Sequence, residues 1–321
     1  MRAIAAQTAA SVVVCLLIAT SAQAALIAAD PYPVGPNRAA GEYAADTSIQ
    51  STANDGLVTP GFATGRYTGG TGTSNFVARA TGYDHAASNA TSATGRVQWI
   101  GPALDTINRS VARNLSPAAP ASSTYYMSHL MSRASIPQAG GVGFVLTGYG
   151  NTTFPTLGTT TGNLLGVYVG FAQDGVADNF GNLVIRTRNE GAATSADTVL
   201  VNGASTSTAS TVYHVVTKVD VNVGGGSADT VTWWLNPTDG SSDASLTATA
   251  DATGSISTFA ISTSADLVRL NYAARQWNGS AFFDEPRLST DLAGLGLAVP
   301  EPAGLAVLGI STLALLRRRG S

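Results

Sequence analysis

The stretch TVYHVVTKVDVNVGGGSADTVTWWLNP, residues Thr211–Pro237, predicts two long antiparallel β-strands joined by a turn. From Tyr213 to Val223 every second residue is apolar or β-branched, which is the period of a strand with one buried face. The three glycines at 224–226 permit a turn because they accept positive φ. Asp229–Leu235 then resumes the alternation. We therefore expect a hairpin with one core face, made up of Tyr213, Val215, Val219, Val221, Val231, Trp233 and Leu235.

Short apolar runs separated by turn residues continue on both sides of this hairpin. Such spacing favours an all-β antiparallel sandwich of the jelly-roll type, in which each strand buries one face and leaves the other wet. Residues 25–298 show no convincing helical periodicity, and SPAAPASS at Ser116–Ser123 predicts a surface loop. The other predicted strands are Phe76–Ala80, Arg96–Ile100, Thr124–Arg133, Gly143–Gly148, Leu164–Phe171, Asn182–Arg188, Thr198–Val201, Ile256–Ser262, Leu267–Tyr272 and Phe282–Leu288.

The first 24 residues have the pattern of a secretory signal peptide. Arg2 provides the positive start and Val12–Ile18 the apolar centre. Ala22-Gln23-Ala24 provides the small-x-small cleavage site before Ala25. The apolar centre is too short for a membrane anchor, because a helical span needs roughly 20 apolar residues. We therefore expect the protein to be exported and this segment to be removed.

Charge and cysteine content narrow the range of partners. The whole chain carries 17 basic and 20 acidic residues. Without residues 1–24 and 299–321, 13 basic and 19 acidic side chains remain, a net charge of −6. Nucleic acid is therefore not an expected partner. The single cysteine, Cys15, lies in the signal peptide, so an exported domain would depend on its core or on bound ions rather than on disulfides.

Several runs in the second half of the chain resemble one family of bacterial secreted domains. These runs are YYMSHLMSR, GGVGFVL, LLGVYVGF, FGNLVIRT, TWWLNP and the late FFDEPRLSTDLAGL. They are similar to domains of the concanavalin A-like (LamG-like or lectin-like) jelly-roll class, over about residues 124–297. The resemblance implies a jelly-roll fold for residues 25–298. It leaves the activity open, because this class includes lectins, glycosidases, lyases and adhesive modules.

The C-terminal residues 299–321 resemble a second known signal. Pro300-Glu301-Pro302 is followed by the apolar run Ala303–Leu316 and then by Arg317, Arg318 and Arg319. This order resembles the PEP-CTERM sorting signal of bacteria. The resemblance implies a transient C-terminal transmembrane helix, a membrane-embedded exosortase as processing partner, and delivery to the cell surface or an exopolysaccharide matrix.

Carboxylate pairs are the first place to look for an enzyme, because glycosidases hold two of them across the scissile bond. The glutamates are at positions 42, 190, 285 and 301, and none lies in the E-x-D-x-x-E arrangement of jelly-roll glucanases. Asp284 and Glu285 are neighbours, and neighbours on a regular strand point to opposite faces. We therefore expect these two residues to have structural roles and assign no catalytic residue.

Histidines and acidic loops give one candidate metal site. His85, His129 and His214 are too scattered for a metal motif, and His214 falls on the polar face of its strand, where we expect it to be solvated. Asp174, Asp178 and Asn179 share a Gly-bearing loop, and such oxygen ligands suit Ca²⁺. An Asx-turn between two strands explains the same residues, and both interpretations stay open.

The tryptophans are candidate sugar platforms. Trp233 shares the core face of the hairpin, whereas Trp234 lies on the other face. Trp234 and Trp277 would stack on sugar rings if they were exposed, and burial beneath a loop is the alternative for both.

These observations predict a non-enzymatic protein of the cell surface or extracellular matrix with a structural, adhesive or glycan-binding jelly roll. Extracellular polysaccharide is its expected ligand, and Ca²⁺ is the one cofactor that the sequence suggests. The alternative is a carbohydrate-active enzyme, a glycoside hydrolase or a lyase of the same fold, with a carboxylate pair that its motifs do not reveal.

Overall fold

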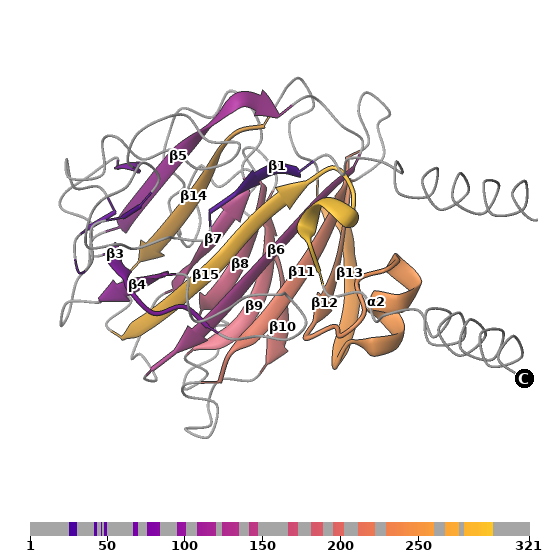
Figure 1. Ribbon diagram of the computed structural model, residues 1–321. Coiled ribbons are helices and arrows are strands. Elements are labelled where there is room, and N and C mark those ends of the chain that lie inside the picture. Colours follow the sequence, from indigo (N-terminus) through magenta and orange to yellow (C-terminus); the bar gives the residue numbers. More distant parts are fainter. Residues whose placement is uncertain are drawn as a thin grey trace, which may run out of the picture.

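The computed structural model describes residues 26–30, 42–43, 46, 48–49, 67–69, 76–83, 95–100, 108–119, 124–134, 141–146, 166–172, 181–188, 195–201, 211–221, 229–259, 267–275 and 279–297. These residues form two antiparallel β-sheets that pack face to face, as Figure 1 shows. The arrangement is consistent with the expected jelly-roll sandwich.

An eight-stranded sheet contains the hairpin predicted from the sequence. β11 pairs antiparallel with β12 on one side and with β6 on the other. β1 joins this sheet through β15, outside the main path. The main path runs β13 (Ala252–Phe259), β12 (Asp229–Leu235), β11 (Tyr213–Asp220), β6 (Thr124–Arg133), β15 (Ser280–Ser289), β4 (Arg96–Ile100) and β3 (Phe76–Arg79), and β1 is Leu26–Ala29.

A seven-stranded sheet covers the inner face of the first. Its central strands, β7, β8 and β9, follow one another in sequence and pair as a meander. The strand β14 then joins this meander to β5. The order is β10 (Ser195–Val201), β9 (Asn182–Arg188), β8 (Gly166–Ala172), β7 (Gly141–Leu146), β14 (Leu267–Arg275), β5 (Asn108–Ala119) and β2 (Thr68–Gly69).

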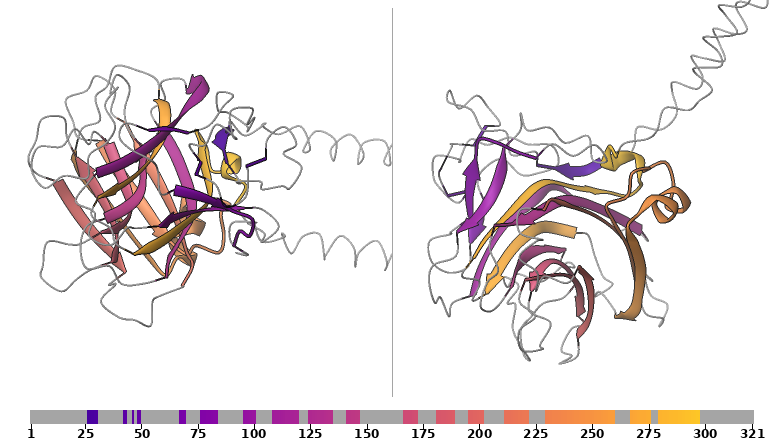
Figure 2. Two further views of the ribbon diagram at one scale, coloured as in Figure 1. Left: turned by 90° about the vertical axis from the view of Figure 1, so that its left-hand side faces the viewer. Right: turned by 90° about the horizontal axis from the view of Figure 1, so that it is seen from below.

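Figure 2 shows that the eight-stranded sheet curves around the seven-stranded sheet. The inner sheet therefore presents its outward face to the concave side of the molecule, and the outer sheet presents its outward face to the convex side. At one edge of the sandwich, β13 approaches β9 and β10.

The core between the sheets confirms the predicted core face of the hairpin. Val215 pairs with Leu235, Thr217 with Trp233, and Val219 with Val231. Six of the seven expected residues are buried in one hydrophobic cluster, and Val221 packs against it half-buried. Burial of this many large apolar side chains is the main stabilising contribution to such a fold, since each contributes about 1.5–3 kcal/mol.

Three local features differ from the sequence prediction. A short helix, α2 (Asp243–Thr249), follows β12, although no helix was expected there. β5 extends from Asn108 to Ala119, so the first four residues of the predicted loop at Ser116–Ser123 belong to a strand. The strand expected at Ile256–Ser262 begins earlier, at Ala252. The remaining predicted strands within the described part are present, with ends shifted by a few residues.

A buried ion pair fixes the segment after β1 inside the sandwich. Arg113 Nη1 on β5 lies 3.2 Å from Asp30 Oδ2, and both side chains are almost fully buried. Tyr43 donates its hydroxyl to the same carboxylate oxygen at 2.6 Å, and Tyr67 does so at 3.3 Å. Burial raises the pKa of Tyr43 well above its usual value. Since a buried carboxylate is tolerated only when it is paired and hydrogen-bonded, this cluster holds the N-terminal segment in one place.

Candidate functional site

The convex face of the eight-stranded sheet carries a buried polar cluster that begins at His214. Ser128 Oγ on β6 lies 2.9 Å from His214 Nε2 on β11, and the His214 backbone N–H donates to Asn236 Oδ1 at 2.8 Å. His214 is 0% exposed. The expectation that His214 is solvated is therefore wrong. The side chain lies on the polar face of β11, but neighbouring residues cover it and exclude water.

The strand β15 places two more buried polar groups, both carboxyls, on the same face through a β-bulge. Its pairing with β6 shifts between Asp284 and Arg287, and Glu285 has a left-handed φ of 49°. The bulge interrupts the regular alternation that the sequence prediction assumed for this pair. As a result Asp284 is 0% and Glu285 4% exposed. A non-glycine residue at positive φ stores strain, which the surrounding packing must offset.

The two carboxyl groups have different electrostatic surroundings. Burial raises the pKa of Asp284 to about 8, although N–H donors from Tyr83 and Glu285 favour its charged form. Asp284 is therefore protonated at neutral pH. Glu285 instead forms an ion pair with Arg287, with 2.9 Å between Oε2 and Nη2. The pair thus combines a buried carboxyl group with a raised pKa and a carboxyl group held in an ion pair.

Arg96 on β4 packs against two aromatic rings on the same face. Its guanidinium carbon lies 4.4 Å from the ring centre of Phe282 and 4.8 Å from that of Tyr83. Burial raises the pKa of the Tyr83 hydroxyl. An arginine between two aromatic faces gains cation–π stabilisation from both.

The polar cluster contains groups of the acid–base type, but they are closed to solvent. Ser128, His214, Asp284 and Glu285 are each at most 4% exposed. A polymer therefore has no access to these four side chains in this structure.

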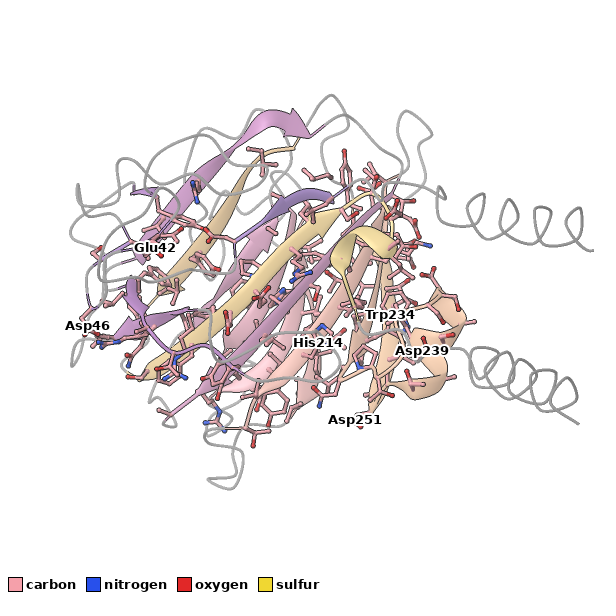
Figure 3. All side chains as sticks on the ribbon, viewed as in Figure 1. Glu42, Asp46, His214, Trp234, Asp239 and Asp251 are labelled. Atoms are coloured by element: carbon pink, nitrogen blue, oxygen red, sulfur yellow. The ribbon has the colours of Figure 1, made fainter. Side chains whose placement is uncertain are left out.

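The other end of the convex face is apolar and covered by α2. Trp234 is 1% exposed and packs with Val216, Leu246, Leu295 and Leu297. Its indole N–H donates to Thr247 on α2 at 2.9 Å, and Figure 3 shows the indole beside this helix. Trp234 is therefore buried beneath a surface element, which was one of the two interpretations of the sequence, and its ring is closed to a sugar.

The concave face belongs to the seven-stranded sheet and has a different composition. Tyr168 on β8 lies on this face, because its neighbours Val167 and Val169 are in the core. Its hydroxyl donates to the Phe171 carbonyl at 2.8 Å.

Close packing surrounds this tyrosine. Its ring covers Gly143 and Gly170, where an added Cβ would meet it at 2.6 Å. Arg186, directly across from Tyr168 on β9, is half-buried. Neither Tyr168 nor the glycine pair was singled out from the sequence, because single glycines and tyrosines in strands carry no local signal of their own.

Most of the other candidate residues lie outside the described residues. This holds for the calcium candidates Asp174, Asp178 and Asn179, for Trp277, His85 and Glu190, for the signal-cleavage residues Ala22, Ala24 and Ala25, and for the sorting motif at 300–302 with Arg317–Arg319. Within the described ranges no group of three or more His, Cys, Asp or Glu side chains is placed to hold a metal ion. In the same ranges no helix is long and apolar enough to cross a membrane.

His129 is the third histidine of the sequence, and it lies on the core side of β6, across from Val215. It is 2% exposed, and burial lowers its pKa to about 3. At neutral pH this imidazole is therefore uncharged, and it packs as part of the sandwich interior.

The sequence matches no family model and no curated protein. Among solved structures, the potassium-bound carbohydrate recognition domain of Emp46p is 10% identical, with a TM-score of 0.40 over 61% of this chain and 83% of that domain. The PL-14 alginate lyase of Aplysia kurodai is 9% identical, with a TM-score of 0.41 over 67% of this chain and 87% of the lyase. The alginate lyase vAL-1 of Chlorella virus is 7% identical, with a TM-score of 0.39 over 67% of this chain and 93% of the lyase.

Proposed function

We propose that this protein is exported, sorted to the cell surface or an exopolysaccharide matrix, and binds polysaccharide there through the concave face of its seven-stranded sheet. The composition of that face carries the proposal. By register, its described strands place mostly Gly, Ala, Ser, Asn and Arg there, and the other residues include Tyr168, Asp197, Leu267 and the valines at 145, 184 and 199. The middle of this face is closed, because Tyr168 and Val184 are 0% exposed. A polymer would therefore contact the end of the sheet beyond Tyr168, where the Arg188 position follows half-buried Arg186 on β9 and offers a polar group.

Export and sorting rest on the two ends of the sequence. The signal-peptide pattern at 1–24 directs the domain outside, and the tail at 299–321 supplies a site for an exosortase-type membrane enzyme. The polysaccharide-binding role fits this location, since an exopolysaccharide matrix offers a ligand at high local concentration.

The alternative function is a carbohydrate-active enzyme, and one observation favours it. Asp284 and Glu285 are adjacent carboxyl groups in different environments, since burial raises the pKa of Asp284 to about 8 whereas Glu285 is paired with Arg287, and unlike environments are a feature of acid–base pairs in enzymes. Their burial argues against this role, and we propose that the protein does not cleave polysaccharides. Turnover of a β-glucan, agar or carrageenan panel, abolished by Glu285→Gln or Glu190→Gln, would establish the enzyme instead.

A glycan array tests the proposed function directly. The exported protein is applied to the array with and without Ca²⁺, because Asp174, Asp178 and Asn179 suggest a calcium loop. Binding to at least one class of polysaccharide is expected. Binding that requires Ca²⁺ would add this ion as a cofactor, and an array without any bound glycan would refute the polysaccharide-binding role.

A further inference from the structure

Four arginines occupy outward register positions on two strands of the seven-stranded sheet. On β9, Leu183 and Ile185 belong to the core, which assigns positions 186 and 188 to the concave face. On β14, Tyr272 and Ala274 belong to the core, which assigns positions 269 and 275 to the same face. All four positions hold arginine. Arg188 and Arg269 lie far apart in the sequence, and the pairing of β9, β8, β7 and β14 brings them onto one sheet.

The register places Arg188 and Arg269 at the same level of the sheet. Arg188 pairs with Gly166 on β8. Leu146 on β7 pairs with Val167 on β8 and with Leu270 on β14, so these three residues form one row across the sheet. Gly166 is the residue before Val167 and Arg269 is the residue before Leu270, so both belong to the next row. Three strand spacings separate β9 from β14, which is about 14 Å at the usual distance between neighbouring strands.

The outward positions of the described strands are rich in arginine for a chain with a net charge of −3. Asp197 on β10, directly across from Arg186, is the one acidic residue at an outward position of the seven described strands. One aspartate against four arginines leaves an excess of three positive charges. A face with one sign of charge attracts ligands of the opposite sign.

We propose that the concave face binds an anionic polysaccharide, one that carries carboxylate or sulfate groups along its length. This inference rests on the proposed function and narrows its ligand. Arginine pairs with carboxylate and sulfate-like oxyanions through two parallel N–H donors. Two arginine positions about 14 Å apart are too distant to share one anion, so their spacing suits a polymer with repeated charges.

The location of the contact follows from burial on the same face. Tyr168 and Val184 are 0% exposed, so the middle of the sheet is closed. Arg188 and Arg269 stand at the next outward level beyond Tyr168, where β9 ends and β8 begins. The polymer contact is therefore expected at this end of the sheet.

The test compares charged and neutral polymers on the exported protein. Binding is measured at low and high salt for a polyuronate, a sulfated polysaccharide, a neutral β-glucan and double-stranded DNA. The variants are Arg188→Gln and Arg269→Gln, with Arg188→Lys to retain the charge. Arg79→Gln is the matched control, because Arg79 lies on β3 of the other sheet and pairs there with Asp46. Thermal melting of each variant confirms that it is folded.

We expect tighter binding to an anionic polymer than to the β-glucan, and weaker binding at high salt. Arg188→Gln and Arg269→Gln should each weaken it by about tenfold, which corresponds to the loss of about one charge-assisted hydrogen bond. Arg188→Lys should weaken it less, and Arg79→Gln should leave it unchanged. The preferred anionic polymer then identifies carboxylate or sulfate as the recognised group.

Three results would overturn the inference. If the neutral β-glucan binds as tightly as the anionic polymers and neither Gln variant weakens this binding, the ligand need not be anionic. The proposed polysaccharide-binding function would then stand, and the present inference would be refuted. DNA that binds as tightly, with the same dependence on Arg188 and Arg269, would show a general polyanion site in place of a polysaccharide site. Failure to bind any glycan would refute the proposed function together with this inference.

Discussion

At the scale of single residues, the two adjacent tryptophans of β12 serve different parts of the molecule. Trp233 packs in the core between the sheets and is 6% exposed, whereas Trp234 packs beneath α2. This division follows from strand alternation and was predicted from the sequence. What alternation could not predict is the cover over Trp234, because that cover comes from a different element.

Trp233→Ala should lower the free energy of unfolding by about 3–5 kcal/mol, as large-to-small changes in a core do. The indole fills the space over Gly254, where an added Cβ would meet the ring at 2.7 Å. Chemical denaturation of the two proteins measures the loss. Trp234→Phe is the comparison, since it removes the hydrogen bond to Thr247 and only part of the buried ring, and should cost less, about 1–3 kcal/mol. A Trp233→Ala variant as stable as the native protein would contradict the assigned core position.

The raised pKa of Asp284 predicts that the free energy of unfolding falls as pH rises. Its pKa is about 8 in the folded protein, against about 3.9 for an unperturbed aspartate. Between these values the folded state keeps a proton that the unfolded state has lost, so the free energy of unfolding falls with rising pH. His129, with a pKa lowered to about 3, acts in the opposite direction below about pH 6.5.

Asp284→Asn removes the first effect and leaves that of His129 in place. The stability of this variant relative to the native protein should therefore increase from about pH 4 to about pH 8 and then level off. Urea unfolding of both proteins at about pH 5 and about pH 8.5 gives the difference. Parallel stability curves across this range would show that Asp284 is not protonated in the folded state.

At the scale of elements, most strands with apolar runs or alternation were predicted, whereas β1, β2 and β5 were not. The two strands of the hairpin and their core face were predicted correctly because Val215, Val219 and Val231 mark that face. β5 was missed because its sequence, NRSVARNLSPAA, places Arg113 among the core positions, where a buried partner neutralises it. α2 was missed because its seven residues bury only Leu246.

In the candidate sites too, local sequence patterns did not predict the arrangement of the residues. The bulge at Asp284 and Glu285 shifts the register within β15, and no residue pattern predicted it. The arginine positions shared by β9 and β14 lie on one sheet because of the strand order, which is not a property of any local stretch. The sequence therefore predicts most strands and one hairpin, but not the residues that strands distant in the chain bring together.

The close contact between β7 and β8 gives an element-scale prediction. At Gly143 an added Cβ would lie 2.5 Å from the Val169 carbonyl oxygen and 2.7 Å from Gly170 Cα. Both are backbone atoms, which cannot move without disturbing the pairing. Gly143→Ala should therefore lower the free energy of unfolding by about 1–3 kcal/mol, or more, through overpacking.

A second substitution separates the backbone contact from the ring contact. If Tyr168 is also changed to Ala, the backbone clash at position 143 remains, so the double variant should not regain stability. Denaturant unfolding of the single and double variants decides this point. Recovery of stability in the double variant would mean that the ring of Tyr168, and not the strand backbone, makes glycine necessary.

At the scale of the whole molecule, the sandwich is packed almost to the start of the tail. Leu295 and Leu297 are buried beside Trp234, and Arg287 Nη1 donates to the Leu295 carbonyl at 2.9 Å. Gly296 has a φ of 61°, and a Cβ there would clash with the Arg287 guanidinium. Only two residues separate Leu297 from Pro300-Glu301-Pro302. A tail inserted in a membrane would therefore hold the domain close to the membrane surface.

The last prediction concerns the fate of that tail. Ala303–Leu316 is 14 residues long, which as a helix spans about 21 Å, whereas the hydrocarbon core of a bilayer is about 30 Å thick. Extension toward the domain would bring Pro300 and Pro302 into the helix, and proline disrupts helices. The segment is therefore a poor permanent anchor, while Arg317–Arg319 would keep its end in the cytoplasm.

We expect the tail to be cut near Pro300-Glu301-Pro302 and to be missing from the protein at the cell surface. Mass spectrometry of the protein extracted from the surface of its native host measures this directly, and the same protein made in a host without a processing enzyme is the control. The control should retain its C-terminal peptide, whereas the native protein should end close to the tripeptide. A native protein that still ends in Gly320-Ser321 would show that the tail is a lasting anchor, because uncut protein would then reach the surface with its apolar segment in place.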